Sequence, residues 1–344
     1  MKGYYLSERP NLSITNSIKA MYDADIIFEN ADLKKLMPTC IAYEGDNKKH
    51  KLYKLLCVLK LKRACKNLNG EYIFIQYPTN LGNVKLFPHF IKNIARKNKV
   101  VFIINNLNGL KHQSAKLSKV DKEVLRRGFR IISQNKLMSE YLHQECRIPL
   151  NRLMSLDFLY YLTNSINVDS REKTNGIVYA GNLNESDAFI NKYIENKIET
   201  KLHIYGESEK KELLDSDNTK YCGEFPTDIV NLKLKGSFGL VWGGSSIDSS
   251  EGKSGEYGKF NSPHKASLYI IARLPIITSK DSAISYLVKK YNIGFAIESL
   301  REIPSKIEEL SDEQYQKMVS NITLIANRIS TGKNLMDIIE EIVN

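Results

Sequence analysis

The chain has 344 residues, 42% of them hydrophobic, and a formal net charge of +11. A single hydrophobic core stops growing at about 250–300 residues, so this length favours two domains. No apolar run reaches the roughly 18 residues that span a bilayer, and the first residues lack the apolar segment of a signal peptide. The five cysteines include no CxxC pair. We therefore expect reduced thiols in a cytoplasmic protein.

The positive charge is concentrated in the first half of the chain. Residues 1–165 carry 28 Lys and Arg against 13 Asp and Glu, whereas the remainder carries 22 against 26. A basic first half is compatible with binding to an acidic membrane surface, a nucleic acid or an anionic acceptor. The charges are scattered over many predicted helices, which favours a compositional bias. No element interleaves basic and aromatic residues, so we expect no nucleic-acid partner. A peripheral membrane contact stays open.

Short apolar strands alternate with longer amphipathic segments, which is typical of parallel sheets with crossover helices. In the first half, the sequence predicts strands at 2–6, 40–43, 71–76, 100–104, 129–133 and 153–156. It predicts helices at 13–30, 50–67, 86–98, 121–127 and 136–145. The basic residues of the helix at 50–67 do not segregate to one side. This pattern predicts a packed helix with snorkelling lysines and not a membrane-surface helix.

The polar stretch 163–175 has no sustained apolar period and is the predicted linker. A second alternation follows, with strands predicted at 176–181, 201–205, 219–222, 238–242, 274–278 and 293–296. Long helices at 312–329 and 335–343 complete the chain. We expect an α/β protein with two Rossmann-like, doubly wound domains at 1–165 and 166–325, followed by a C-terminal helical segment at 326–344.

The segment 257–279 combines a loop, Pro263, a predicted helix from His264 and a short apolar strand. In a parallel sheet, a loop before such a helix lies at the carboxyl ends of the strands, where open α/β sheets bind ligands. The helix start offers free N–H groups, and Lys265 lies in its first turn, which suits a phosphate. A cation there does little for the helix itself. The alternative is an ordinary surface lysine after a proline-started helix.

Four further loops follow strands of the second half. They begin at Gly181, Gly206, Tyr221 and Gly243; the first continues through Asn182 and Asn184, the third lies around the end of its strand, and the fourth runs into Asn261–Lys265. Glycine lets a backbone approach a phosphate, and Asn and Ser supply neutral hydrogen bonds. Together with Lys265, these loops predict a site for a nucleotide or a nucleotide-linked ligand.

Other chemistries lack their motifs. The sequence has no GxGxxG for a dinucleotide cofactor and no GxxxxGK[ST] for a P-loop. Six dispersed histidines exclude a zinc site, and Ser245-Ser246 lacks the G-x-S-x-G elbow. The acidic pairs Asp23-Ala24-Asp25 and Asp215-Ser216-Asp217 fall in a predicted helix and a polar turn, so we interpret both as structural. We expect neither a metal nor a cofactor.

Several stretches carry a resemblance to a known family. They are Asn16–Asp23 (NSIKAMYD), Ile75–Pro78 (IQYP), Ile132–Met138 (ISQNKLM), Tyr179–Leu183 (YAGNL), Asn261–Lys265 (NSPHK) and Leu274–Ile277 (LPII). With two Rossmann-like domains, the chain resembles the GT-B glycosyltransferases. More narrowly, it resembles the bacterial family that contains β-1,6-galactofuranosyltransferases and the glucosyltransferase that extends GlcNAc on serine-rich-repeat adhesins.

The resemblance implies a UDP-sugar donor held mostly by the second domain, without a metal. Asn182 and Asn184 would approach the diphosphate or sugar beside Gly181, and Tyr221 would lie near the nucleoside. Lys265 would neutralise the departing UDP. The residues implied around the diphosphate are Asn261, Ser262, Pro263, His264, Lys265, Ala266 and Ser267. Asn16 would reach the donor from the acceptor side, Gln76 and Tyr77 would line the acceptor pocket, and the last helix would pack on the first domain. Self-association is also compatible with the resemblance.

One departure concerns the catalytic base. After the strand at 100–104 the family commonly has a His-Asp pair and then Leu-Arg, where this chain has Asn105-Asn106 and then Leu110-Lys111. An inverting transfer needs a base, and neither Asn can serve. Asp23 and Asp157 are alternative bases. The anomeric outcome stays open.

Two main hypotheses follow. The first is a transferase that moves glucose, galactose or galactofuranose from a UDP-sugar to a glycan or glycoprotein acceptor. The second is a non-catalytic GT-B-fold partner or chaperone subunit of another glycosyltransferase. A sugar-nucleotide epimerase is disfavoured because its chemistry needs clearer acidic residues at the loops.

Overall fold

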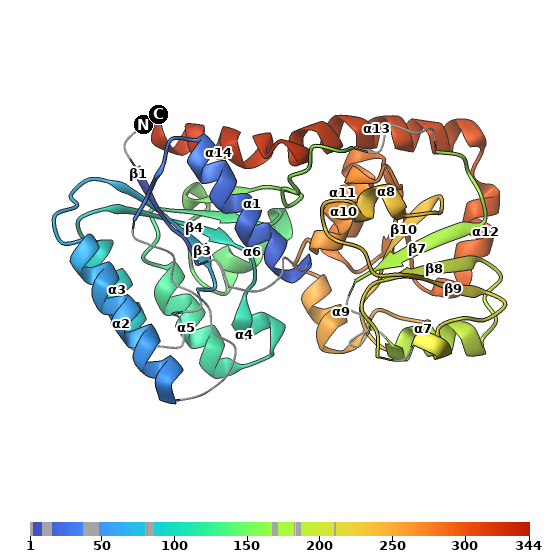
Figure 1. Cartoon of the computed structure of the whole chain (residues 1–344), viewed down its shortest axis with the longest axis horizontal. Coiled ribbons are helices and arrows are strands. Elements are labelled where there is room, and N and C mark those ends of the chain that lie inside the picture. The colour runs from blue at the N-terminus through green and yellow to red at the C-terminus, as the bar shows by residue number, and fades with distance from the viewer. Residues whose placement is uncertain are drawn as a thin grey trace. The chain divides into compact units, whose positions relative to one another are not determined.

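A computed structural model describes residues 3–8, 16–36, 48–79, 81, 86–166, 171–181, 183, 187–209 and 211–344. The chain divides into two compact units (Figure 1). Unit 1 comprises Met1–Leu156 and Gly332–Asn344, and unit 2 comprises Asp157–Thr331. The sequence predicts a boundary at 165–166, whereas in the structure the chain enters unit 2 at Asp157. The predicted strand at 40–43 lies outside the described residues.

Unit 1 contains a six-stranded parallel sheet in the order β2-β1-β3-β4-β5-β6. Its strands are β1 (Gly3–Leu6), β2 (Lys34–Lys35), β3 (Tyr72–Tyr77), β4 (Lys99–Ile104), β5 (Arg130–Ser133) and β6 (Leu153–Ser155). The continuous apolar runs of β3 and β4 are buried on both faces, as expected for central parallel strands. The exposed edge strand β2 consists of two lysines, so its sequence gives no strand signal.

Helices flank this sheet. They are α1 (Asn16–Asn30), α2 (Lys48–Ala64), α3 (Leu86–Ile94), α4 (Asn108–Lys111), α5 (Ala115–Leu125), α6 (Lys136–Gln144) and α14 (Lys333–Val343), with the 3-10 turn η1 (Leu150–Arg152). Helix α3 contacts α2 and α5, and α1 contacts α14. The C-terminal helix α14 buries Leu335, Ile339 and Ile342. The predicted packing of the last helix on the first domain is therefore confirmed.

Unit 2 repeats the architecture with the parallel order β12-β11-β10-β7-β8-β9. Its strands are β7 (Gly176–Ala180), β8 (Lys201–Tyr205), β9 (Thr219–Gly223), β10 (Phe238–Val241), β11 (Ile276–Ser279) and β12 (Gly294–Ile297). Its helices are α7 (Asp187–Glu195), α8 (Val230–Lys233), α9 (Gly252–Gly258), α10 (His264–Ile271), α11 (Ala283–Tyr291), α12 (Ile303–Glu309) and α13 (Asp312–Ser330), with 3-10 turns η2 (Lys211–Leu213) and η3 (Leu300–Glu302). All six predicted strands of the second half are present.

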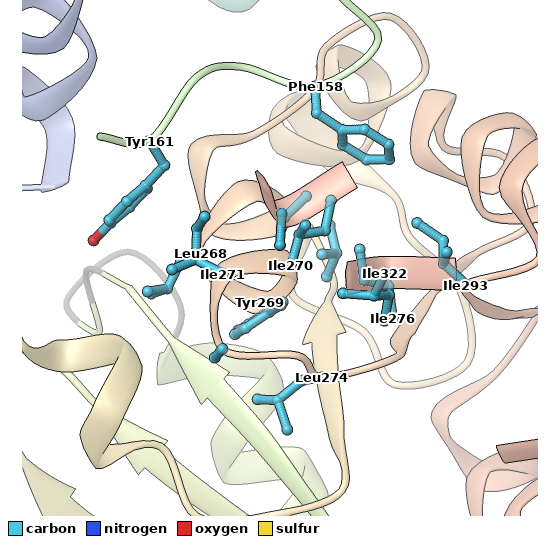
Figure 2. Packing of buried hydrophobic residues seen from close by; sticks show 14 of the residues in the cluster. Phe158, Tyr161, Leu268, Tyr269, Ile270, Ile271, Leu274, Ile276, Ile293 and Ile322 are labelled. Atoms are coloured by element: carbon cyan, nitrogen blue, oxygen red, sulfur yellow. The ribbon is translucent and has the colours of Figure 1, made fainter. Parts of the chain in front are cut away.

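Helix α10 is the centre of the unit 2 core. Six consecutive residues from Ala266 to Ile271 are buried, so the helix is enclosed on all sides (Figure 2). It contacts β10 and β11 of the sheet and, on another side, α13. From α13, Ile322, Ala326 and Ile329 join the same apolar cluster. This packing fixes the position of the α10 N-terminus.

The segment after Asp157 is attached to unit 2 by backbone hydrogen bonds. Tyr161 N donates to Ile329 O (2.9 Å), and Thr163 N donates to Ser330 O (3.2 Å). Within the predicted linker, Arg171 donates to the carbonyl of Ala272 at the end of α10 (2.8 Å). These bonds explain why the polar composition of 163–175 does not mark the boundary. Among the described helices, none is long and apolar enough to cross a membrane.

Candidate functional site

The topology of unit 2 creates a switch point at its first strand. Strand β7 lies between β8 and β10, so the chain leaves β7 towards one side of the sheet and leaves β10 towards the other. Ligands of open α/β sheets bind outside the carboxyl ends of strands at such a point. The residues that follow β7 and β10 are Gly181 and Trp242.

Helix α10 presents an uncapped N-terminus. Pro263 is the N-cap residue, and no side chain accepts a hydrogen bond from the first turn. The eight-residue helix therefore leaves N–H groups and the positive end of its dipole for an anion. The sequence predicts this helix start correctly.

Lys265 holds its amine over the end of β7. Its Nζ donates to the hydroxyl of Tyr179 (2.8 Å) and lies 3.9 Å from the centroid of that ring. A Cβ at Gly181 would lie 3.3 Å from the same Nζ. The absence of a side chain at position 181 leaves room for the amine. Lys265 thus places a half-buried positive charge where the β7 loop begins.

Other predicted residues of this segment hold the helix in place. Ser262 Oγ donates to the carbonyl of Asp157 (2.9 Å), and Ser267 Oγ donates to that of Leu159 (2.7 Å). His264 Nε2 lies 3.0 Å from the Tyr160 carbonyl oxygen.

The His264 ring also stacks on Tyr161, with centroids 4.8 Å apart. Ala266 is fully buried, whereas Asn261 is half-buried. Three of the predicted side chains, Ser262, His264 and Ser267, therefore bind the 157–161 segment to α10. A donor contact for this set stays a prediction.

The loops after β7, β8 and β9 touch one another. Gly181 N donates to Tyr205 O (3.1 Å), and Gly206 N donates to Gly223 O (3.0 Å). Gly206 has φ +133°, and a Cβ there would lie 1.9 Å from Gly181 O. Only glycine fits such a backbone and such a close approach. Tyr221, predicted near the nucleoside, donates its hydroxyl to Gly206 O (3.0 Å).

The loop after β10 folds back on itself. Gly244 has φ +97°, and its Cβ would lie 2.2 Å from Glu251 O. Ser250 Oγ donates to Gly243 O (2.9 Å). The chain then forms α9 before it reaches Asn261. The sequence does not predict α9, because three of its seven residues are glycines, which are poor helix formers.

Tyr269 joins α10 to the two strands of the switch point, a role that no sequence motif predicts. Its hydroxyl accepts from Ala180 N (2.9 Å) and donates to Leu240 O (3.1 Å). A Cβ at Gly239 would lie 2.3 Å from the Tyr269 ring. A glycine within a buried strand often marks close approach of another group, so Gly239 was the available signal.

The carboxyl edge of the unit 1 sheet is a network of buried side chains. Gln76 donates to Asp25 Oδ1 (3.2 Å) and to Met21 O (3.0 Å), and its Oε1 accepts from Asn105 Nδ2 (2.9 Å). Ser7 Oγ donates to Asp25 Oδ2 (2.5 Å). Gln76 is 4% exposed. Gln76, which the sequence predicts to contact the acceptor, is thus buried within a hydrogen-bond network of unit 1.

Tyr77, the other predicted acceptor residue, is also buried. Its hydroxyl donates to Asp121 Oδ1 (2.6 Å), and Gly109 N donates to Asp121 Oδ2 (2.8 Å). Burial raises the pKa of Asp121, although these two hydrogen bonds oppose the shift. Burial and the neighbouring Asp121 raise the pKa of Tyr77 well above its usual range. The pair fixes the α4–α5 region to β3.

The alternative bases are also engaged in the protein. Asp23 is buried and pairs with Lys19 (3.0 Å). Asp157 lies 2.6 Å from Lys290 Nζ and 2.5 Å from the Tyr291 hydroxyl. Both carboxylates thus have structural contacts, and a base stays unassigned.

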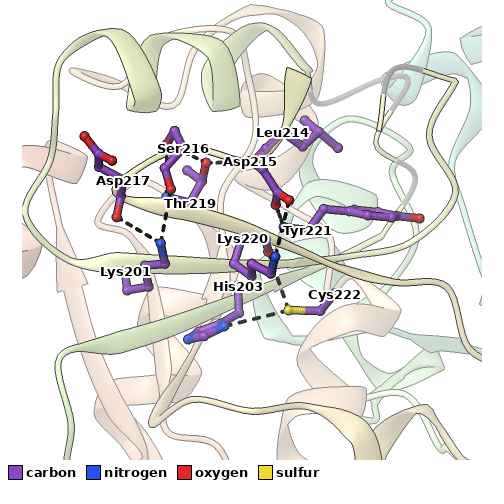
Figure 3. Close-up of polar contacts among 10 residues, drawn as sticks. All are labelled: Lys201, His203, Leu214, Asp215, Ser216, Asp217, Thr219, Lys220, Tyr221 and Cys222. Atoms are coloured by element: carbon purple, nitrogen blue, oxygen red, sulfur yellow. Dashed lines mark hydrogen bonds and ion pairs between the residues drawn. The ribbon is translucent and has the colours of Figure 1, made fainter. Parts of the chain in front are cut away.

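The acidic turn at Asp215-Ser216-Asp217 precedes β9 and is structural (Figure 3). Asp215 Oδ1 accepts from Tyr221 N (2.6 Å), and Lys220 lies 3.3 Å from Oδ2. The Tyr221 hydrogen bond lowers the pKa of Asp215. Lys201 Nζ donates to the Asp217 carbonyl (2.9 Å). These contacts support the interpretation that the two aspartates of this turn have a structural role.

Two parts of the predicted site lack described side chains. Asn182 and Asn184 lie outside the described residues, and Asn16 is described only as the first residue of α1. In the described part of the chain, no group of three His, Cys, Asp or Glu side chains could hold a metal ion. The four cysteines described there, Cys57, Cys65, Cys146 and Cys222, are free thiols.

Comparison with known sequences agrees with the predicted resemblance. Residues 177–342 match the model of the glucosyltransferase 3-like C-terminal domain. The β-1,6-galactofuranosyltransferase WbbI of Escherichia coli K12 is 28% identical over 288 residues, which cover 80% of each chain. Glucosyltransferase 3 of Streptococcus gordonii is 30% identical over 150 residues, 42% of this chain and 43% of that protein.

Comparison with solved structures identifies the fold. The crystal structure of Anabaena HepE in complex with UDP aligns with a TM-score of 0.61 over 99% of both chains, at 11% identity. The two six-stranded parallel sheets and their flanking helices form a GT-B fold, as the sequence predicts.

Proposed function

We propose that this chain is a glycosyltransferase that takes a hexose from a UDP-sugar. One observation carries the proposal: Lys265 and the uncapped α10 N-terminus lie together beside Gly181 at the switch point of unit 2. A diphosphate needs both a cation and backbone donors, and this place offers both. The similarity to WbbI over most of the chain supports transfer of a hexose.

The chemistry expected at this place is stabilisation of the departing UDP. Negative charge grows on the diphosphate as the bond to the sugar breaks. Fixed donors directed at that charge lower the barrier because they need no reorganisation during the step. Lys265 is held by Tyr179, so its amine is already positioned before the step. This part of the reaction requires no metal and no cofactor besides the donor.

The same proposal assigns roles to the other predicted donor and acceptor residues. Asn182 and Asn184 would contact the donor from the β7 loop, and Tyr221 would support the nucleoside side through Gly206. The acceptor would be a glycan or a glycosylated protein. Asn16, Gln76 and Tyr77 would affect acceptor binding, the last two through the buried hydrogen bonds described above.

A thermal-shift panel of UDP, GDP, CMP, dTDP and NAD tests the proposal. UDP should raise the melting temperature of the wild type more than the other ligands do. Lys265→Ala should weaken UDP binding about 10- to 100-fold, because it removes a charge-assisted contact. Lys259→Ala is the matched control, since Lys259 is a nearby, partly exposed lysine paired with Glu256. No response to any nucleotide, or equal losses in both variants, would contradict the proposal.

A second candidate function is a non-catalytic partner of another glycosyltransferase. It rests on Asn105, whose amide binds Gln76 at the place where the resemblance described above implies a His-Asp pair, and on the paired states of Asp23 and Asp157. An assay of UDP-glucose and UDP-galactofuranose turnover separates the two. Transfer or hydrolysis by the purified chain supports the enzyme. UDP binding without turnover, with stable association to a second transferase, supports the partner.

A further inference from the structure

Helix α2 of unit 1 has two apolar faces. Cys57, Val58 and Leu61, together with Cys65 directly after the helix, are buried, with exposed fractions of 6% or less. These residues form the face that packs into unit 1, where α2 contacts α3 (Figure 1). The prediction of a packed helix holds for this face.

The opposite face of α2 exposes a row of leucines. Leu52 is 58% exposed, Leu56 47% and Leu59 49%. Their spacing of four and three residues aligns them along one side of a helix. Elsewhere in the described chain, the leucines with exposed fractions as large as those of this row lie singly on separate elements. These are Leu150, Leu213 and Leu324.

Cations surround the leucine row. Helical geometry continues the row to Arg63 and places Lys60 on one side of it and Lys62 on the other. Lys60, Lys62, Arg63 and the following Lys66 are all exposed. None of the four forms an ion pair with another residue of the described chain. Long cationic side chains beside an apolar stripe can extend to lipid headgroups while their methylene groups contact the stripe.

The charge of the surrounding sequence matches one partner. Residues 48–104 contain 13 Lys and Arg and a single acidic residue, Glu71, so their net charge of +12 exceeds that of the whole chain. A second copy of the same face would bring these like charges together. A nucleic acid would match the charge but not the leucines. An anionic membrane surface matches both.

We propose that α2 docks this protein on the surface of an anionic lipid bilayer. Leu52, Leu56 and Leu59 enter the headgroup region, and the surrounding Lys and Arg residues bind the lipid phosphates. This inference goes beyond the proposed function and does not depend on it. It replaces the sequence-based view of α2 as a helix without a membrane face.

The test is sedimentation of the full chain with vesicles. Vesicles of phosphatidylcholine with one third phosphatidylglycerol should bind the wild type at least tenfold more strongly than pure phosphatidylcholine vesicles. Binding should fall as salt rises, because each cation near the surface contributes about fivefold at low salt. Equal binding to both vesicles, or none to either, would overturn the proposal.

Matched variants locate the binding surface. Replacing Leu52, Leu56 and Leu59 by Gln should weaken binding at least tenfold, and the triple control L150Q, L213Q and L324Q should retain it. Replacing Lys60, Lys62, Arg63 and Lys66 by Gln should also weaken binding at least tenfold. Its control replaces the exposed Lys192, Lys233, Lys289 and Lys317 of unit 2 by Gln, so the change in net charge is the same.

Three results would contradict this assignment. The first is an equal loss in a variant and its control. The second is normal vesicle binding by the leucine variant. The third is a wild-type dimer, seen by ultracentrifugation, that the leucine variant dissociates without a change in vesicle binding. The melting temperature of each variant shows whether it folds. The shift that UDP produces in that temperature reports on the donor site, so a failure of the membrane proposal can be told apart from a failure of the proposed function.

Discussion

The carboxyl edges of the two sheets differ in what they present. In unit 2 the edge consists of backbone and glycine, with Lys265 above it and three loops joined through Gly206. In unit 1 the corresponding edge is filled by side chains that bind one another, with Gln76 between Asp25 and Asn105. Both sheets place their first strand inside the sheet, so topology alone does not produce the difference.

The comparison shows two uses of one architecture. Glycine loops leave room for a ligand to approach the backbone, and the ligand supplies the missing hydrogen-bond partners. The buried polar side chains of unit 1 bind one another instead, although Asn105 Oδ1 has no hydrogen-bond partner among the described residues, and a network of this kind gives a rigid surface. The edge of unit 2 is therefore the better candidate for holding a diphosphate.

Substitution of Gly206 should break the unit 2 edge and has the largest expected effect. In Gly206→Ala the new Cβ meets Gly181 O in a backbone conformation that other residues avoid. We expect a loss of about 3 kcal/mol in unfolding free energy, measured with denaturant, and weaker UDP binding. Gly258→Ala is the control, because its Cβ would meet nothing within 4 Å. A stable Gly206→Ala protein would show that the loops are not tightly joined.

Substitution of Gln76 should break the unit 1 edge with a smaller effect. Gln76→Leu keeps the volume but removes one hydrogen-bond partner from each of Asp25, Met21 and Asn105, which should cost about 2 kcal/mol. The exposed Gln144→Leu in the same unit should change stability by less than about 0.5 kcal/mol. The UDP-induced thermal shift should persist in both. A loss of that shift only in Gln76→Leu would mean that the buried hydrogen-bond network around Gln76 also affects the donor site.

The smallest expected effect concerns pH and lies away from the donor edge. Burial, with Lys201 and Lys235 nearby, lowers the pKa of His203. Protonation then favours the unfolded chain, so this contribution to stability is present above pH 6.5 and is lost as the pH falls through the folded-state pKa. The fall in melting temperature between about pH 8 and pH 5 should be smaller in His203→Gln than in the wild type. An identical fall in both proteins would exclude His203 as its cause.

Much of the fold could be predicted from local patterns. Apolar runs bounded by turn residues identify β3, β4 and the inner strands of unit 2, because central parallel strands are buried on both faces. Pro263 before an apolar segment identifies the start of α10. Helix α9 and strand β2 could not be found in this way, since a glycine-rich helix and a two-lysine strand depend on their neighbours.

The sequence by itself determined the alternation of strands and helices, the glycine loops and the place of Lys265 at a helix start. These features depend on neighbours in the chain. The tertiary structure decided which polar groups are consumed internally, as for Gln76 and Tyr77, and which apolar residues stay outside, as on α2. It also decided the role of Tyr269. The reason is that burial and pairing join residues far apart in sequence, and a local sequence pattern does not identify those distant partners.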